Sequence, residues 1–157
     1  MQKIVPFLWF DSNAEEAMTF YTSIFKRSRI VSVSRYGDAW PGPKGSVMTA
    51  TIQLEGQDFH LLNGGPLFTF SPAISFFVKC ETQEEVDELW EKLSDGGEPG
   101  QCGWLKDKFG VSWQIIPTVL GEMLNDKDTT RAQRVMMAML RMKKIDIAQL
   151  KQAYERQ

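Results

Sequence analysis

A combination of strand, cap and helix signals occurs twice in this chain, and this repeat constrains the fold more than any other feature. The apolar run at residues 4–10 is typical of a buried strand, and a similar run returns at residues 73–80. Each run leads into a capping-box signal, first at Asn13–Glu16 and then at Thr82–Glu85. The apolar helix positions that follow correspond at an offset of 69 residues (86 minus 17), with Ala17, Phe20, Tyr21 and Ile24 matching Val86, Leu89, Trp90 and Leu93. An internal duplication is the simplest explanation.

Strand signals follow both predicted helices. They cover residues 29–36, 47–54 and 58–62 in the first half, and residues 98–104, 104–106 and 111–116 in the second. The segment Gly56–Leu62 matches Gly110–Ile116 at an offset of 54 (114 minus 60), which makes His60 and Gln114 structural equivalents. The sequence therefore predicts an α+β fold of two tandem βαβββ modules.

The two modules are expected at residues 1–66 and 67–117, and helix-forming residues dominate after Pro117. Helices are predicted over residues 118–124, 129–142 and 145–154, as a helical appendage, residues 118–157, of the same domain. Its apolar side chains lie at helical spacing: Val135, Met136, Met139, Leu140 and Met142. They indicate either a binding groove of soft side chains or packing and subunit contact, and we expect a homodimer.

The first module has a longer loop between its second and third strands than the second module has. The insertion Asp38–Pro43, within the Gly- and Pro-rich loop of residues 37–45, accounts for the difference between the two offsets. This loop is interpreted either as a lid over a ligand or as an ordinary surface loop. Trp40 within it, and Trp104 beside a glycine-rich turn, are candidates for the wall of a ligand cavity.

Charge and cysteine content exclude several classes of function. The net charge of -2, from 18 basic and 20 acidic residues, provides no basic field for nucleic acid or for an anionic membrane. The first apolar run is too short to span a bilayer, so a cytoplasmic protein is expected. Cys80 and Cys102 form neither a disulfide framework nor a zinc-site pattern, and both are expected as free thiols.

Three segments carry a resemblance to a known family. They are the run Asp107–Pro117 with its Phe-Gly-x-x-Trp-Gln pattern, the opening Pro6–Asp11, and the tail Lys144–Ile147. The chain resembles the vicinal oxygen chelate (glyoxalase, bleomycin-resistance and dioxygenase-like) superfamily, in the PhnB-like branch labelled 3-demethylubiquinone 3-methyltransferase-like. The resemblance implies that paired βαβββ modules curl their sheets into a cavity. It also implies metal ligands at four positions, on the first and last strand of each module.

The four positions are poor in metal ligands in this sequence. Counting back from the two caps gives Pro6 and Ser75, and the glycine turns give His60 and Gln114. A divalent transition metal needs about three or four donors from His, Glu, Asp or Cys, and only His60 is a strong one. Gln114 stands where relatives usually carry a metal-binding Glu. We therefore expect no metal at the usual place.

His60 and Gln114 remain open to several interpretations. His60, the only histidine, is a general base, a hydrogen-bonding group for a ligand, or a strand histidine satisfied by a neighbour. Alternation places Trp113 on one face of its strand and Gln114 on the other, where its amide holds either a ligand or a neighbouring strand.

The methyltransferase label implies a nucleotide-type cofactor, which usually needs a Gly-rich loop between a strand and a helix. The sequence has no such loop, so we expect no cofactor and disfavour this activity. The leading expectation is a glyoxalase-like protein that binds a small apolar or aromatic molecule. The alternative is a metal-dependent lyase or dioxygenase of the same superfamily, and whether the chain is an enzyme stays open.

Overall fold

The computed structural model describes residues 2–39 and 42–156. The chain divides into two compact units, Met1–Phe70 and Ser71–Gln157. We call their βαβββ parts module one and module two. Among the described residues, no helix has the length and apolar character needed to cross a membrane.

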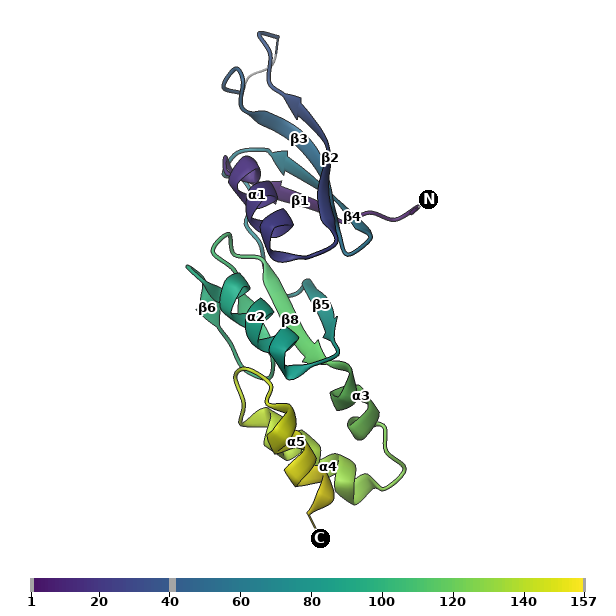
Figure 1. Cartoon of the computed structure of the whole chain (residues 1–157). Helices are drawn as coiled ribbons and strands as arrows, with labels where there is room; N and C mark the ends of the chain where they lie inside the picture. The colour runs from purple at the N-terminus through teal and green to yellow at the C-terminus, as the bar shows by residue number, and fades with distance from the viewer. Residues whose placement is uncertain (1, 40–41, 157) are drawn as a thin grey trace. The chain divides into compact units, whose positions relative to one another are not determined.

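Module one has the element order predicted from the sequence (Figure 1). The strands are β1 (Phe7–Phe10), β2 (Ser28–Arg35), β3 (Val47–Leu54) and β4 (Gln57–Asn63), and helix α1 (Ala14–Ile24) follows β1. They form one sheet in the order β1-β4-β3-β2, in which β1 is parallel to β4 and the remaining pairs are antiparallel.

Module two repeats this topology. Its strands are β5 (Ser75–Cys80), β6 (Glu98–Pro99), β7 (Trp104–Lys106) and β8 (Ser112–Pro117), and helix α2 (Gln83–Ser94) follows β5. The order is β5-β8-β7-β6, again with the first and last strands of the module parallel. The predicted α+β fold of two βαβββ modules is confirmed.

Each sheet buries one face under its helix, because alternate side chains of a strand point to opposite faces. In module one this face is apolar and includes Leu8, Phe10, Ala50, Ile52 and Leu61 beneath α1. In module two Leu105, Trp113 and Ile115 are buried, with Val86 and Leu93 of α2. The opposite face of each sheet, here called the open face, carries polar and partly exposed side chains.

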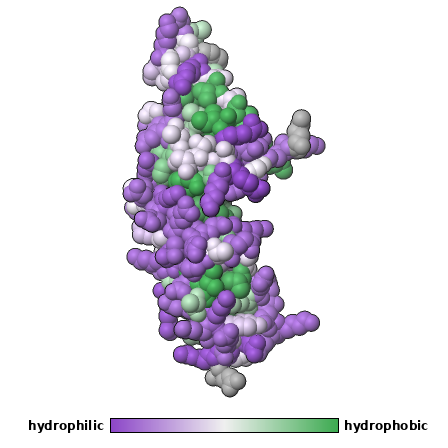
Figure 2. Space-filling view, in the orientation of Figure 1, coloured by the Kyte–Doolittle hydropathy of each residue, from purple (hydrophilic) through white to green (hydrophobic). Residues whose placement is uncertain are grey.

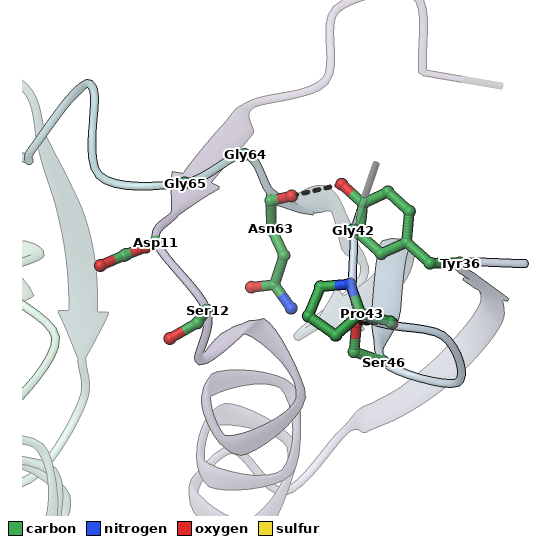
Figure 3. A pocket seen from close by; sticks show the side chains of 9 residues that line it. All are labelled: Asp11, Ser12, Tyr36, Gly42, Pro43, Ser46, Asn63, Gly64 and Gly65. Carbon is green, nitrogen blue, oxygen red and sulfur yellow. Dashed lines mark hydrogen bonds between the residues drawn. The ribbon is translucent and has the colours of Figure 1, made fainter. Parts of the chain in front are cut away.

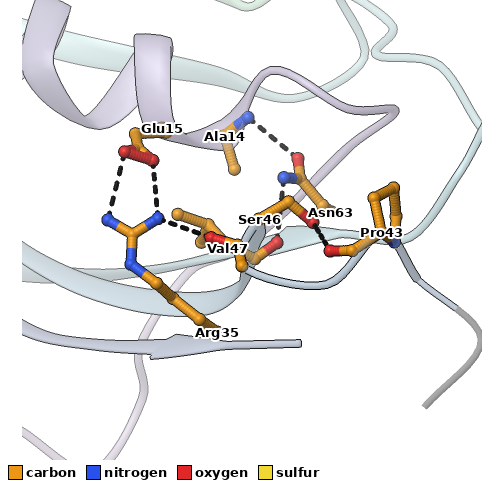
Figure 4. A network of polar contacts seen from close by, with 8 residues as sticks. Ala14, Glu15, Arg35, Pro43, Ser46, Val47 and Asn63 are labelled. Carbon is orange, nitrogen blue, oxygen red and sulfur yellow. Dashed lines mark hydrogen bonds and ion pairs between the residues drawn. The ribbon is translucent and has the colours of Figure 1, made fainter. Parts of the chain in front are cut away.

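The two helices begin with different caps, which corrects one prediction. Thr82 accepts a hydrogen bond from the Glu85 N–H, as the capping-box signal predicted. Asn13 makes no side-chain cap, because its backbone (φ -115°, ψ 27°) departs from the extended conformation of Thr82 (φ -131°, ψ 160°). Instead Asn63 of β4 accepts from the Ala14 N–H at 2.8 Å, while its Nδ2 donates to the Val47 carbonyl (Figure 4).

The strand register corrects the offset between the modules. Phe7 lies opposite His60 and Phe77 lies opposite Gln114, so the first strands correspond at 70 residues (77 minus 7), whereas the helices correspond at 69. Ser75 is therefore not the counterpart of Pro6. The first-strand residue beside His60 is Phe7.

The C-terminal segment forms helices α3 (Thr118–Leu124), α4 (Thr129–Leu140) and α5 (Ile147–Glu155), with α4 and α5 side by side (Figure 1). They enclose a cluster of buried residues: Ile116, Leu120, Met123, Val135, Met142, Ile145 and Leu150. The connection between α4 and α5 is tied to module two, because the Cys102 and Gly103 N–H groups donate to the carbonyls of Met142 and Lys143. The appendage thus buries the β8 end of the module-two open face.

Candidate functional site

The open face of module one gathers its polar and aromatic side chains around His60. The His60 Nδ1 lies 2.8 Å from the Thr51 hydroxyl oxygen on the neighbouring strand β3. The Phe7 ring on β1 meets the imidazole edge-on, with ring centroids 5.8 Å apart, and is 56% exposed. Within the described part of the chain, the other ring nitrogen, Nε2, has no protein partner. His60 is thus held by a neighbour and keeps one polar atom for a ligand.

The open face of module two has the same plan around Gln114. Its Nε2 donates to the Ser75 hydroxyl at 3.0 Å. Phe77 on β5 and Trp104 on β7 both lie opposite Gln114 in the register, so the three side chains share one face. Phe77 is 54% exposed, and Trp104 is half-buried. The Gln114 Oε1 has no protein partner among the residues that the structure describes.

The structure brings some predicted site residues together. Ser75, Trp104 and Gln114 form one group, and His60 lies on the corresponding face of module one. Trp40 lies outside the described residues.

Sequence reasoning missed Phe7, Thr51 and Phe77. The two phenylalanines could have been found by aligning the two first strands on their apolar residues rather than on the helix caps. That alignment places Phe7 beside His60 and Phe77 beside Gln114.

The donors on the two open faces do not fit a catalytic metal. The four equivalent positions hold Phe7, His60, Phe77 and Gln114, with Ser75 beside the last. A transition-metal site needs about three or four strong donors, and His60 is the one such group here. Among the described residues no cluster of three His, Cys, Asp or Glu side chains could hold a metal ion.

The two strand-to-helix connections also lack the glycine-rich loop that usually binds a nucleotide-type cofactor. The connection from β1 to α1 is Asp11-Ser12-Asn13, and the connection from β5 to α2 is Glu81-Thr82. Neither contains a glycine that would let a pyrophosphate or sulfonium group approach the backbone.

A pocket of about 420 Å³ lies at the other end of β4, between the start of α1 and the loop after β2 (Figure 3). The described residues that line it are Asp11, Ser12, Tyr36, Gly42, Pro43, Ser46, Asn63, Gly64 and Gly65. Among the residues that the structure describes, none of the predicted site residues lines it. The loop predicted as a lid or surface loop does wall this pocket, through Gly42 and Pro43.

Polar contacts hold this loop in place. The Tyr36 hydroxyl donates to the Asn63 carbonyl at 2.7 Å. Arg35 bonds both carboxylate oxygens of Glu15, at 2.9 and 3.1 Å, and donates to the Gly45 carbonyl (Figure 4). The hydrogen bond from Arg35 lowers the pKa of Glu15 and raises that of Arg35. Both side chains are about half exposed, so the pair positions the loop more than it stabilises the fold.

Comparisons with known proteins agree with this architecture. A family model described as 3-demethylubiquinone-9 3-methyltransferase matches residues 2–116. The solved structure of a PhnB protein from Bacillus cereus is 46% identical, with a TM-score of 0.69, and the match covers 74% of this chain and 100% of that one. Protein PA1353 from Pseudomonas aeruginosa is 22% identical, covers 74% and 98% of the two chains, and has a TM-score of 0.63, which shows the fold alone. No curated protein matches the chain.

Proposed function

Because the chain belongs to the 3-demethylubiquinone-9 3-methyltransferase family, in its PhnB-like form, we propose that it binds a small apolar or aromatic molecule on the open faces of its modules. The proposal does not extend to the methyl transfer in the family description, since the strand-to-helix connections do not fit the cofactor. It also assigns no metal to the family position.

One observation carries the proposal. In each module a half-exposed phenylalanine stands beside a polar side chain that a neighbour holds in place: Phe7 beside His60, and Phe77 beside Gln114. Large aromatic side chains that stay exposed on a sheet leave apolar area to be covered. A fixed polar group beside such a ring orients a ligand rather than merely attracting it.

The polar atoms indicate what the ligand carries. If Thr51 donates to the His60 Nδ1, then Nε2 bears a proton and donates to a ligand carbonyl; in the other tautomer Nε2 accepts from a hydroxyl. The Gln114 Oε1 accepts from a ligand N–H or O–H, because its Nε2 is engaged by Ser75. A flat apolar molecule with one carbonyl or hydroxyl group suits this arrangement.

The rival function, a metal-dependent lyase or dioxygenase, requires three or four strong donors together, and the described residues contain no group of three His, Cys, Asp or Glu side chains that could hold a metal ion. The cytoplasmic location expected from the sequence is part of the proposal, because free thiols at Cys80 and Cys102 suit a reducing compartment.

The test of binding uses acetophenone and benzamide as neutral aromatic probes, detected by ligand NMR and titration. We expect His60→Ala to weaken probe binding by ~1–3 kcal/mol through the lost hydrogen bond, with little change in thermal stability. Gln114→Ala should act likewise on a second site. Thr19→Ala on the exposed side of α1, which covers the opposite face of the sheet, is the control and should change neither quantity by more than about 0.5 kcal/mol.

Two results would contradict the proposal. One is a His60→Ala variant that loses more than about 2 kcal/mol of stability with unchanged probe affinity, which would make His60 a purely structural partner of Thr51. The other is one equivalent of zinc, nickel, iron or manganese retained after dialysis against a weak chelator, which would favour the rival enzyme.

A further inference from the structure

Thr51 holds the His60 imidazole through a hydrogen bond whose direction decides what the ring offers a ligand. The two residues lie opposite each other on β3 and β4, and the Thr51 Oγ1 is 2.8 Å from the His60 Nδ1. The His60 backbone N–H donates to the carbonyl of Pro6, just before β1, and a β-branched threonine has few side-chain rotamers. The imidazole therefore has a defined position on the open face.

Two arrangements of the protons fit this contact. In the first, the Thr51 hydroxyl donates to a bare Nδ1, and the proton of the neutral imidazole is on Nε2. In the second, Nδ1 carries the proton and donates to the hydroxyl oxygen, which leaves Nε2 bare. A general base or a metal ligand needs the second arrangement, because both roles use the lone pair of Nε2.

The count of donors and acceptors favours the first arrangement. Among the residues that the structure describes, the Thr51 hydroxyl has no partner other than His60. In the second arrangement the hydroxyl proton of this partly buried side chain has no protein acceptor, which costs free energy. In the first arrangement the hydroxyl proton and the Nδ1 lone pair satisfy each other, and the Nε2–H remains for a ligand.

We propose that Thr51 is a positioning residue that keeps the His60 Nε2 protonated, so that the open face of module one binds the carbonyl oxygen of an aromatic molecule. This inference rests on the proposed function and narrows it. A carbonyl oxygen accepts a hydrogen bond and cannot donate one, whereas a ligand group that only donates meets the Nε2 proton. His60 is then neither a general base nor a metal ligand through Nε2.

The neighbours of His60 suit the apolar part of such a ligand. Most of the surface seen in Figure 2 is hydrophilic, and apolar side chains gather in a few patches. On the open face of module one, Phe7 stands beside His60, and Trp9 and Leu62 lie opposite each other two residues further along β1 and β4. An aromatic ring on these side chains can bring its carbonyl to the Nε2–H.

The first test reads the protonation of His60 directly. His60 is the only histidine of the chain, so nitrogen NMR spectra of the imidazole contain the signals of one residue. At alkaline pH, where an imidazole is neutral, the bare nitrogen resonates far downfield of the protonated one. We expect the bare nitrogen of the wild type to be Nδ1. A bare Nε2, or an equal mixture of the two forms, overturns this inference and leaves the proposed function standing.

The second test asks whether Thr51 is the cause. Thr51→Val keeps the shape of the side chain, suits a strand and removes the hydroxyl, so the two nitrogen signals should move toward the averaged values of an unconstrained histidine. Thr51→Ser should restore the wild-type signals. Thr49→Val, on the same strand but opposite Leu62, is the control and should leave them unchanged. Signals that Thr51→Val does not move overturn the role of Thr51.

The third test compares two probes of the same shape at the His60 signals, which report on module one alone. Acetophenone carries a carbonyl, and α-methylstyrene replaces its oxygen with a methylene group. Acetophenone should bind at least about fivefold more tightly, the ratio that one hydrogen bond of ~1 kcal/mol gives. Thr51→Val should weaken acetophenone about two- to tenfold, because the imidazole must then be ordered on binding.

The outcomes separate this inference from the proposed function. Tighter binding of acetophenone, reduced by Thr51→Val and restored by Thr51→Ser, supports the inference. Equal binding of the two probes overturns the inference alone, because the open face then binds aromatic molecules without selecting a carbonyl. Binding of neither probe at His60 overturns the proposed function for module one together with this inference.

Discussion

The two modules share a fold, but the polar contacts that cap their helices span different separations in the sequence. In module one the helix start is capped by Asn63, 49 residues away in the sequence, and in module two it is capped by Thr82, three residues away from the N–H that it binds. Both contacts satisfy an N–H at the start of a helix. The duplication therefore preserves the need for a cap and leaves its source free to change.

The turns before the last strand of each module also differ, and here module two is the one that depends on a side chain. Module one turns through Glu55 and Gly56, both with positive φ, as a tight two-residue hairpin requires. Module two turns through Asp107–Gly110 around a carboxylate that is 2% exposed. Asp107 accepts from the N–H groups of Phe109, Val111 and the Trp113 indole, all at 2.9–3.0 Å. Backbone geometry shapes one turn, and a buried carboxyl group that accepts three hydrogen bonds shapes the other.

The largest expected effect separates these two turns. Asp107→Ala leaves three donors without their acceptor, and we expect a loss of ~3 kcal/mol or more. Gln53→Ala, at the equivalent position of module one, removes only a bond from Gln53 to Asp58 and should cost less than about 1 kcal/mol. Urea unfolding gives both values, and equal losses would show that the turns do not differ as described.

A smaller effect separates the two caps. Asn63→Ala removes the Ala14 cap and the tie to the Val47 carbonyl together, and we expect a loss of ~2 kcal/mol. Thr82→Ala removes one local cap, with an expected loss of ~1 kcal/mol. Hydrogen exchange resolved by segment should show the first loss in residues 2–39 and 42–70 and the second in residues 71–156. A greater loss for Thr82→Ala would contradict the ranking.

The smallest expected effect concerns a contact between the appendage and helix α2 of module two, which has no counterpart in module one. Lys144 and Gln83 both donate to Asp87, at 2.8 and 2.9 Å, and these bonds lower the pKa of Asp87 below its ordinary 3.8. A lowered carboxyl pKa means that the stabilisation is complete above pH 3.8 and is lost as pH falls through the lower folded value. Since both side chains are over a third exposed, the effect should be a fraction of a kcal/mol.

Asp87→Asn tests this pH dependence. The variant should be slightly less stable than the wild type at neutral pH and equal to it at low pH, as measured by thermal unfolding across the acid range. Glu88→Gln, which breaks an exposed pair with Lys92 on the same helix, is the control. A constant difference between Asp87→Asn and wild type at every pH would remove Asp87 as the titrating group.

The sequence predicted what depends on local pattern. The repeated elements, the opposite directions of Trp113 and Gln114, and the Thr82 cap all follow from short-range spacing, and the structure has them. The Asn63 cap was beyond such reasoning, because its partner lies on another element. Ile116 alternates as an open-face residue but is 7% exposed, because the C-terminal helices cover it.

The positions of Phe7 and Phe77 were missed for a different physical reason. Three residues separate Phe10 from the start of α1, whereas two separate Cys80 from the start of α2. One residue fewer in the turn shifts the strand by one place, and a shift of one place exchanges the faces of a strand. When the 69-residue offset of the helices is applied to the first strands, it therefore places their residues on the wrong face of the sheet.

The ties between α2 and the appendage affect the order in which the molecule can fold. Gln83 donates to the Ile145 carbonyl and accepts from the Ile147 N–H, across separations of 62 and 64 residues. Module one closes its longest contacts within its own unit, so it can fold during synthesis while the rest of the chain is still being made. The second unit has to wait for residues as far as Leu150, and long loops close slowly. We therefore expect refolding in two phases, with the slower one reporting on module two.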